Sequence, residues 1–127
     1  FYMCREVVKY MQSAHSGSIV NISSVGGVFH NSGFAYAAAK SAVIGMTRNM
    51  AMQFAAEGIR VNAVCPGNIL TPMGKTLSWS KKDPKTYIPA GRYGTAEDIA
   101  NAVLFYASDL SDYVTGDYMN VNGGLYM

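Results

Sequence analysis

Two observations predict an α/β fold with a parallel sheet. Short runs of mainly apolar or β-branched residues at about 18–23, 59–65 and 118–122 have the length of buried strands. Longer segments with helical periodicity separate these runs. Strands that alternate with helices of this length form parallel βαβ units with right-handed crossovers. In such a sheet, ligands bind beyond the carboxyl ends of the strands.

The N-terminal half supplies the first of these units. Apolar residues recur at a helical period over 1–13, which predicts the first helix. A glycine-containing loop at 26–33 follows the first predicted strand. A long helix rich in Ala and Met is then expected over 36–56, and Gly58 is placed to end it near the C-cap.

The C-terminal half contains a long segment between predicted elements. The second strand stops at Pro66-Gly67, and residues 68–94 are rich in proline and glycine. Long loops in compact domains are usually lids or binding loops, so we expect a functional loop with some helix here. Thr95 and Asp98 have the spacing of a capping box, which predicts a helix from there to about residue 108.

Chemistry is indicated by Tyr36, Lys40 and Ser24. Tyr36 and Lys40 lie four residues apart, so a helix puts both on one face. An ammonium group near a phenol favours the phenolate, and such a tyrosine can act as a general acid or base. Ser24 follows the first strand and could meet the same substrate oxygen. The pattern predicts chemistry on a carbonyl or an alcohol, although each residue alone is also common in a structural role.

Composition bounds the class of protein. The chain has 127 residues, is 50% apolar and 14% charged, and carries a net charge of +2. These values are typical of one globular domain and not of a disordered chain. The lysines at 81–82 form the only basic cluster, so we expect no nucleic-acid partner. No apolar run approaches the length of a membrane span, so we expect no membrane partner.

Cysteine and histidine usage adds two expectations. Cys4 and Cys65 lie in apolar surroundings, which is typical of reduced thiols in a cytoplasmic protein. His15 and His30 lie in predicted loops without a second ligand at metal spacing, so no metal site is expected. His30 is at most a substrate-pocket residue.

In order and spacing, these motifs resemble the short-chain dehydrogenase/reductase family of Rossmann-fold, NAD(P)-dependent oxidoreductases. A lone Tyr-x-x-x-Lys is a weak signal, but the ordered set covers essentially the whole chain and is very specific. The matching segments are 17–24, 36–42, 58–67, 68–73, 90–94, 97–100, 107–109 and 114–124.

The resemblance implies that residues 1–127 are a single-domain fragment, the C-terminal half of a Rossmann-type doubly wound parallel sheet. Three strands of an expected seven would lie here, with the substrate loop at about 68–94. The glycine-rich dinucleotide loop, the residue that discriminates NAD from NADP, and the family's catalytic asparagine would all precede Phe1. We therefore expect the fragment alone to be inactive.

The resemblance also implies roles for single residues. Ser24, Tyr36 and Lys40 would be catalytic, and the cofactor would be NADP or NAD, with NADPH slightly favoured. Thr71 has an alternative role as a helix N-cap before Pro72. The residues expected to bind the cofactor are Tyr36, Lys40, Pro66, Gly67, Ile69 and Thr71.

Within the family, the chain most resembles the 3-oxoacyl-acyl-carrier-protein reductases of fatty acid biosynthesis, and full-length members form homo-tetramers or dimers. Those enzymes often carry basic residues at the ends of the two long helices, where this chain reads 12–14 Gln-Ser-Ala and 56–58 Ala-Glu-Gly. A sugar, polyol or steroid dehydrogenase therefore remains an alternative. A non-catalytic assembly fragment is a third possibility, which has no need of the Ser-Tyr-Lys pattern.

Overall fold

The computed structural model describes residues 1–29 and 32–126, and these form the expected α/β fold. His30, the suggested pocket residue, lies outside the described residues. The strands are β1 (Gly17–Ile22), β2 (Ile59–Pro66) and β3 (Tyr118–Val121). The helices are α1 (Tyr2–Ala14), α2 (Phe34–Phe54) and α3 (Ala96–Ala107). Each strand and helix lies within about two residues of its predicted position.

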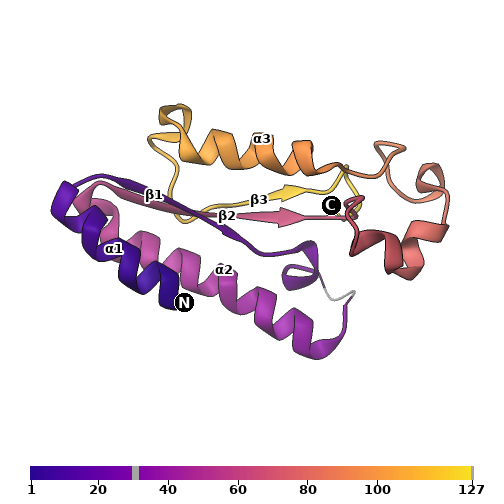
Figure 1. Cartoon of the computed structure of the whole chain (residues 1–127), viewed down its shortest axis with the longest axis horizontal. Helices are drawn as coiled ribbons and strands as arrows, with labels where there is room; N and C mark the ends of the chain where they lie inside the picture. The colour runs from indigo at the N-terminus through magenta and orange to yellow at the C-terminus, as the bar shows by residue number, and fades with distance from the viewer. Residues whose placement is uncertain (30–31, 127) are drawn as a thin grey trace.

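The three strands form one sheet in the order β1-β2-β3, and both pairings are parallel. Val61 of the central strand lies opposite Ile19, and Cys65 lies opposite Asn120. All carboxyl ends of the strands therefore point to the same edge, as Figure 1 shows. This arrangement confirms the parallel sheet that the alternation of elements predicted.

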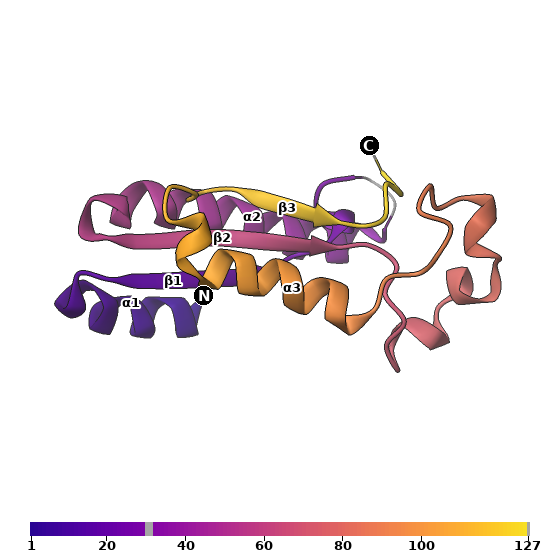
Figure 2. The ribbon, with the colours of Figure 1, turned by 90° about the horizontal axis from the view of Figure 1, so that it is seen from above.

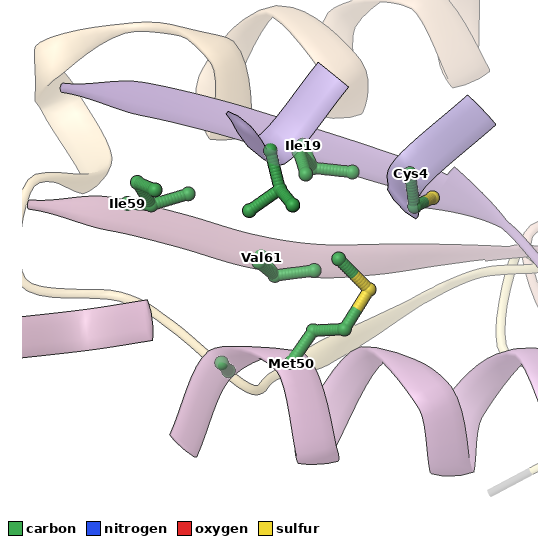
Figure 3. Packing of buried hydrophobic residues seen from close by; sticks show 7 residues of the cluster. Cys4, Ile19, Met50, Ile59 and Val61 are labelled. Atoms are coloured by element: carbon green, nitrogen blue, oxygen red, sulfur yellow. The ribbon is translucent and has the colours of Figure 1, made fainter. Parts of the chain in front are cut away.

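Helices cover both faces of the sheet. Helices α1 and α2 lie on one face and α3 lies on the other (Figure 1). On the first face Cys4, Ile19 and Met50 close over Ile59 and Val61 of β2, as Figure 3 shows. The side chains of a strand alternate between its faces, so the central strand is buried on both sides and reads as a continuous apolar run.

On the other face, Arg60 joins β2 to the end of α3. Its guanidinium group donates hydrogen bonds to the carbonyl oxygens of Tyr106 (2.8 Å) and Ser108 (3.1 Å), and to Ser111 Oγ (2.7 Å). A cation suits this position because the last carbonyl groups of a helix lack partners within it. The buried Tyr106 side chain belongs to the hydrophobic cluster of this face, together with Val64 and Ala102.

The helix ends follow the predicted signals. Thr95 and Asp98 form the capping box that begins α3. Gly58, with φ of 75°, ends the short 3₁₀ turn that follows α2. The segment 68–94 contains only short 3₁₀ turns, at Gly74–Thr76, Ser78–Lys81 and Pro84–Thr86. In the part of the chain described here, no helix is long and apolar enough to cross a membrane.

Candidate active site

The predicted site residues lie beyond the carboxyl ends of two neighbouring strands. Ser24 comes two residues after the end of β1, and the segment 66–71 leads away from the end of β2. Figure 2 shows the loop after β1, the segment after β2 and the C-terminus at the same end of the sheet. The parallel register of β1 and β2 is what brings the two segments to this edge.

Ser24 is held in place by hydrogen bonds of its own side chain and of its neighbour's backbone. It is the N-cap of a single 3₁₀ turn, η1 (Val25–Gly27), and its Oγ accepts a hydrogen bond from the Gly26 N–H (3.1 Å). The preceding Ser23 N–H donates to the carbonyl oxygen of Val64 (2.8 Å), which extends the pairing of β1 with β2. The local capping role and a catalytic role are compatible, because the Ser24 hydroxyl hydrogen is not used by this bond.

Turn η1 packs directly against the backbone of α2. A Cβ on Gly27 would lie 2.6 Å from the carbonyl carbon of Lys40, so only glycine fits there. Two hydroxyl groups bridge the same contact: Ser23 Oγ donates to the carbonyl oxygen of Lys40 (2.7 Å), and Ser41 Oγ donates to that of Gly27 (2.7 Å). The position of α2 relative to Ser24 is therefore fixed through main-chain atoms.

Tyr36 and Lys40 lie on the face of α2 that meets this turn. Lys40 Nζ donates a hydrogen bond to the carbonyl oxygen of Ile22 (3.2 Å) and lies 5.8 Å from the centre of the Tyr36 ring. The Tyr36 ring edge lies against Gly26, where a Cβ would be 3.2 Å from Cε1. Tyr36 is 49% exposed, and within the described residues its hydroxyl group has no hydrogen-bond partner.

The segment after β2 begins with Pro66 and Gly67. Pro66 is the last residue of β2 and lies opposite Val121, whose carbonyl oxygen accepts a hydrogen bond from the Gly67 N–H (3.0 Å). A Cβ on Gly67 would lie 2.7 Å from Cβ of Asn122, so this glycine permits close approach to the end of β3. These contacts fix the start of the segment that contains Ile69 against the end of β3.

Ile69 and Thr71 keep donor groups available for a ligand. The Ile69 carbonyl oxygen accepts from the Thr71 N–H (2.9 Å), but its own N–H makes no hydrogen bond to any described residue. Thr71 Oγ1 accepts from the Gly74 N–H (3.0 Å), as an N-cap would, although only a 3₁₀ turn follows. An unpaired N–H beside a hydroxyl hydrogen fits the carboxamide oxygen of a nicotinamide.

The rest of the 68–94 segment is cross-linked by phenol groups that sequence reasoning missed. Tyr93 Oη lies within donating distance of the carbonyl oxygens of Trp79 (2.7 Å) and Lys82 (2.6 Å). Asn68 Nδ2 donates to Tyr87 Oη (3.1 Å), which lies 3.4 Å from Tyr93 Oη. Burial, followed by the bond to Tyr87, raises the pKa of Tyr93 to about 12, so the phenol stays protonated at neutral pH.

Trp79 packs within this segment. Its ring lies 5.2 Å from the Tyr93 ring and 3.1 Å from where a Cβ on Gly74 would be. These contacts are those of a side chain that packs within the loop. The aromatic residues of the 68–94 segment lie outside any long helix or strand. Their spacing in the sequence therefore shows no helical or strand period that could have predicted these contacts.

The two cysteines are buried and free, and they form no disulfide. Cys65 lies in β2 near the site, and burial raises the pKa of its thiol despite the hydrogen bond to Ser23. A neutral, enclosed thiol is a poor nucleophile. Cys65 is therefore not a candidate nucleophile at this edge of the sheet.

A family model described as enoyl-(acyl carrier protein) reductase matches residues 1–126. The chain belongs to the short-chain dehydrogenase/reductase family. Among curated members, the 3-oxoacyl-[acyl-carrier-protein] reductase of Thermotoga maritima is 47% identical over 127 residues, covering 98% of this chain and 52% of that protein. The chain spans about half the length of the curated relatives it matches.

Solved structures of the family share this fold. A 3-oxoacyl-[acyl-carrier protein] reductase from Brucella melitensis superimposes with a TM-score of 0.91 and 38% identity, over 98% of this chain and 48% of that one. A putative NAD(P)-dependent gluconate 5-dehydrogenase from Beutenbergia cavernae, with bound NADP, gives 0.88 and 36% identity, over 95% and 50%. The Rossmann-type sheet predicted from the sequence is confirmed.

Proposed function

We propose that the full-length protein is an NAD(P)-dependent reductase that converts a 3-oxoacyl thioester to its 3-hydroxy form, with NADPH favoured. The observation that carries this proposal is the packing of η1 on α2, which joins Ser24, Tyr36 and Lys40 through main-chain contacts. The likeness to 3-oxoacyl reductases over almost the whole chain supports the substrate class.

In this proposal the bound nicotinamide supplies the hydride to the substrate carbon. Ser24 and Tyr36 donate hydrogen bonds to the substrate oxygen, where negative charge develops as the carbonyl is reduced. The exposed Tyr36 hydroxyl then transfers its proton to that oxygen. Lys40 holds its ammonium group beside the Tyr36 ring, because the Ile22 carbonyl oxygen fixes its other side.

The cofactor would be held by the residues that follow β2. The Ile69 N–H and the Thr71 hydroxyl would meet the carboxamide, while Pro66 and Gly67 would lie along the nicotinamide. Lys40 would also donate to the nicotinamide ribose. The available donors of Ile69 and Thr71 support this assignment, because a buried acceptor on a ligand needs such partners.

The test is Tyr36→Phe in the full-length protein, which we expect to lower kcat by a factor on the order of 10²–10⁴, the usual contribution of a positioned acid or base. The Kd for NADPH should stay close to that of the wild type, because the ring and Lys40 remain. Tyr113→Phe is the matched control, since Tyr113 is 99% exposed. Wild-type turnover in the Tyr36 variant would overturn the proposed mechanism.

A second candidate function is a sugar or polyol dehydrogenase. Neither α1 nor α2 has a basic residue in its last turn, where reductases of acyl carrier proteins are expected to dock their acidic partner. A likeness to a putative gluconate 5-dehydrogenase points the same way. Comparing kcat/KM for a 3-oxoacyl thioester, a keto-sugar acid and a steroid ketone, each with NADH and NADPH, separates these candidates.

A further inference from the structure

The backbone at Ile69 is positioned by a pairing that sequence reasoning did not anticipate. Gly94, from the far end of the long loop, forms an isolated parallel bridge with Ile69. The Leu70 N–H donates to the Gly94 carbonyl oxygen (2.9 Å), and the Gly94 N–H donates to that of Asn68 (3.0 Å). The residues on both sides of Ile69 are therefore hydrogen-bonded to this one glycine.

Gly94 also contacts the side chain of Ile69. A Cβ on Gly94 would collide with Cδ1 of Ile69, and the Ile69 side chain is buried. The two residues are in direct contact, and the hydrogen bonds of Gly94 to Asn68 and Leu70 join their backbones. Whatever fixes Gly94 also fixes the backbone that carries the Ile69 N–H.

One carboxylate, that of Asp98, binds residues on both sides of Gly94 in the sequence. On the C-terminal side, Asp98 Oδ2 accepts hydrogen bonds from the Thr95 N–H (2.8 Å) and the Thr95 hydroxyl (3.1 Å). On the N-terminal side, Arg92 binds Asp98 through both terminal nitrogens of its guanidinium group. Nη1 donates to Oδ2 (2.7 Å) and Nη2 donates to Oδ1 (2.9 Å). Arg92 Nη1 also donates to the Tyr93 carbonyl oxygen (3.0 Å).

This pair differs from the other ion pairs among the described residues. Arg5, Glu6 and Lys9 lie within one stretch of α1, so their contacts join neighbours that the helix already fixes. The Arg92–Asp98 pair instead spans the residues that lead into the bridge. Exposed ion pairs contribute little to stability, but a bidentate Arg–carboxylate pair defines geometry.

We propose that Arg92 is a positioning residue for the cofactor, acting through Asp98 and Gly94 on the backbone of the Asn68–Thr71 segment. This proposal rests on the proposed function, in which the Ile69 N–H meets the nicotinamide carboxamide. Ile69, Gly94, Arg92 and Asp98 help to line one cavity of about 100 Å³, so the pair and the segment border the same space. Breaking the pair would release the residues that hold Gly94 against this segment.

The test compares two ligands that share a phosphate-bearing adenosine but differ in the nicotinamide. In the full-length protein, Kd values are measured for NADPH and for 2′,5′-ADP (for NADH and ADP, if NADH binds more tightly). We expect Arg92→Met to raise the Kd for NADPH by about tenfold, as for one lost hydrogen bond of good geometry. The Kd for 2′,5′-ADP should not change, which also reports an intact fold.

Two further variants sharpen the result. Arg92→Lys keeps the charge but loses the bidentate fork, so its Kd for NADPH should lie between those of the wild type and Arg92→Met. Lys9→Met removes an exposed ion pair far from the site and should change neither Kd.

The outcomes separate this proposal from the proposed function. If the wild type binds neither NADPH nor NADH, or if Tyr36→Phe retains turnover, the proposed function fails and the role of Arg92 fails with it. If Tyr36→Phe abolishes turnover but Arg92→Met binds NADPH like the wild type, only the role of Arg92 is wrong. If Arg92→Met raised the Kd for NADPH and the Kd for 2′,5′-ADP by the same factor, Arg92 would contribute only to the general stability of the fold, and the positioning role would also be wrong.

Discussion

The two segments that meet at the carboxyl edge of the sheet are held in different ways. Turn η1 is fixed on α2 by main-chain contact at Gly27 and by hydroxyl-to-carbonyl hydrogen bonds from Ser23 and Ser41. The 68–94 segment is fixed by the longer side chains of Arg92 and Tyr93. The first contact presses a glycine against the backbone of a helix, whereas the second relies on an ion pair and on the hydroxyl group of a phenol.

The difference suits the roles proposed for the two segments. A proton donor must stay within hydrogen-bond reach of the reacting oxygen, and small displacements of such groups are costly. A segment that receives a cofactor and a substrate has to admit them and release them. Loops that gate binding are drawn from the less stable parts of a fold.

The largest expected effect comes from filling the tight contact. Gly27→Ala puts a methyl group against the backbone of Lys40, which forces η1 and α2 apart. We expect a loss of about 1–3 kcal/mol in the free energy of unfolding, as for other overpacked sites. Turnover should fall by about 10²-fold, because Ser24 and Tyr36 lose their relative placement. Chemical denaturation and steady-state kinetics measure the two effects.

Gly45→Ala is the matched control for this change. Gly45 lies in the same helix with no atom near the position of a new Cβ. Alanine there should stabilise the helix by about 0.5–1 kcal/mol, because glycine is a poor helix former. If Gly27→Ala behaved like Gly45→Ala, the tight contact would not be what fixes the site.

A smaller and more local effect is expected for Tyr93→Phe. The variant keeps the ring against Trp79 but loses the hydroxyl group that bonds the carbonyl oxygens of Trp79 and Lys82. Hydrogen exchange should become faster in residues 79–93 while the sheet keeps its protection, and the emission of Trp79 should shift. Tyr113→Phe, which alters a fully exposed phenol, serves as the control. Unchanged exchange in 79–93 would show that the phenol does not fasten the loop.

The smallest expected effect is a dependence of stability on pH, which appears at acid pH and is confined to the second segment. The Arg92 guanidinium group, with a smaller contribution from the Thr95 N–H, holds the pKa of Asp98 well below its usual value of 3.8. Because the folded pKa is depressed, the stabilisation is present above that value and is lost only as the pH falls through the folded pKa. In Arg92→Met the pKa of Asp98 should move back toward its usual value.

The measurement for this prediction is the titration of the Asp98 carboxylate by NMR in both proteins. The contacts of η1 with α2 are bonds between hydroxyl and carbonyl groups, which do not titrate in this range, so amide signals of 24–27 should not follow the same transition. A single transition shared by both segments would remove the contrast between them.

The sequence predicted most of the first segment and little of the second. Tyr36 and Lys40 are separated by one helical turn, and Ser24 follows a strand, so local spacing was enough to place them. The bridge from Ile69 to Gly94 joins residues 25 positions apart within a stretch that has no helical or strand period. Residues 66–71 were found through the family resemblance, and their cofactor role stays a prediction.

The residues that position the site were harder to find than the residues proposed to act in it. Gly27 read as a loop marker and Ser23 as a strand residue, although both contact α2. Thr71 was expected to begin a helix in its structural alternative, and only a 3₁₀ turn follows it. Arg92 pairs with Asp98 across the start of α3, a contact that no sequence motif indicated.

Local chemistry, then, determined the order of strands and helices, the capping box at Thr95 and the Tyr36–Lys40 face of α2. These features depend on hydrogen bonds and side-chain periods within a few residues of one another, which a sequence displays directly. Only the tertiary structure decided that Gly27 lies against Lys40 and that Arg92 is linked through Asp98 and Gly94 to Ile69. Such contacts arise when separate elements pack at one edge of the sheet, and steric fit between distant residues leaves no period in the chain.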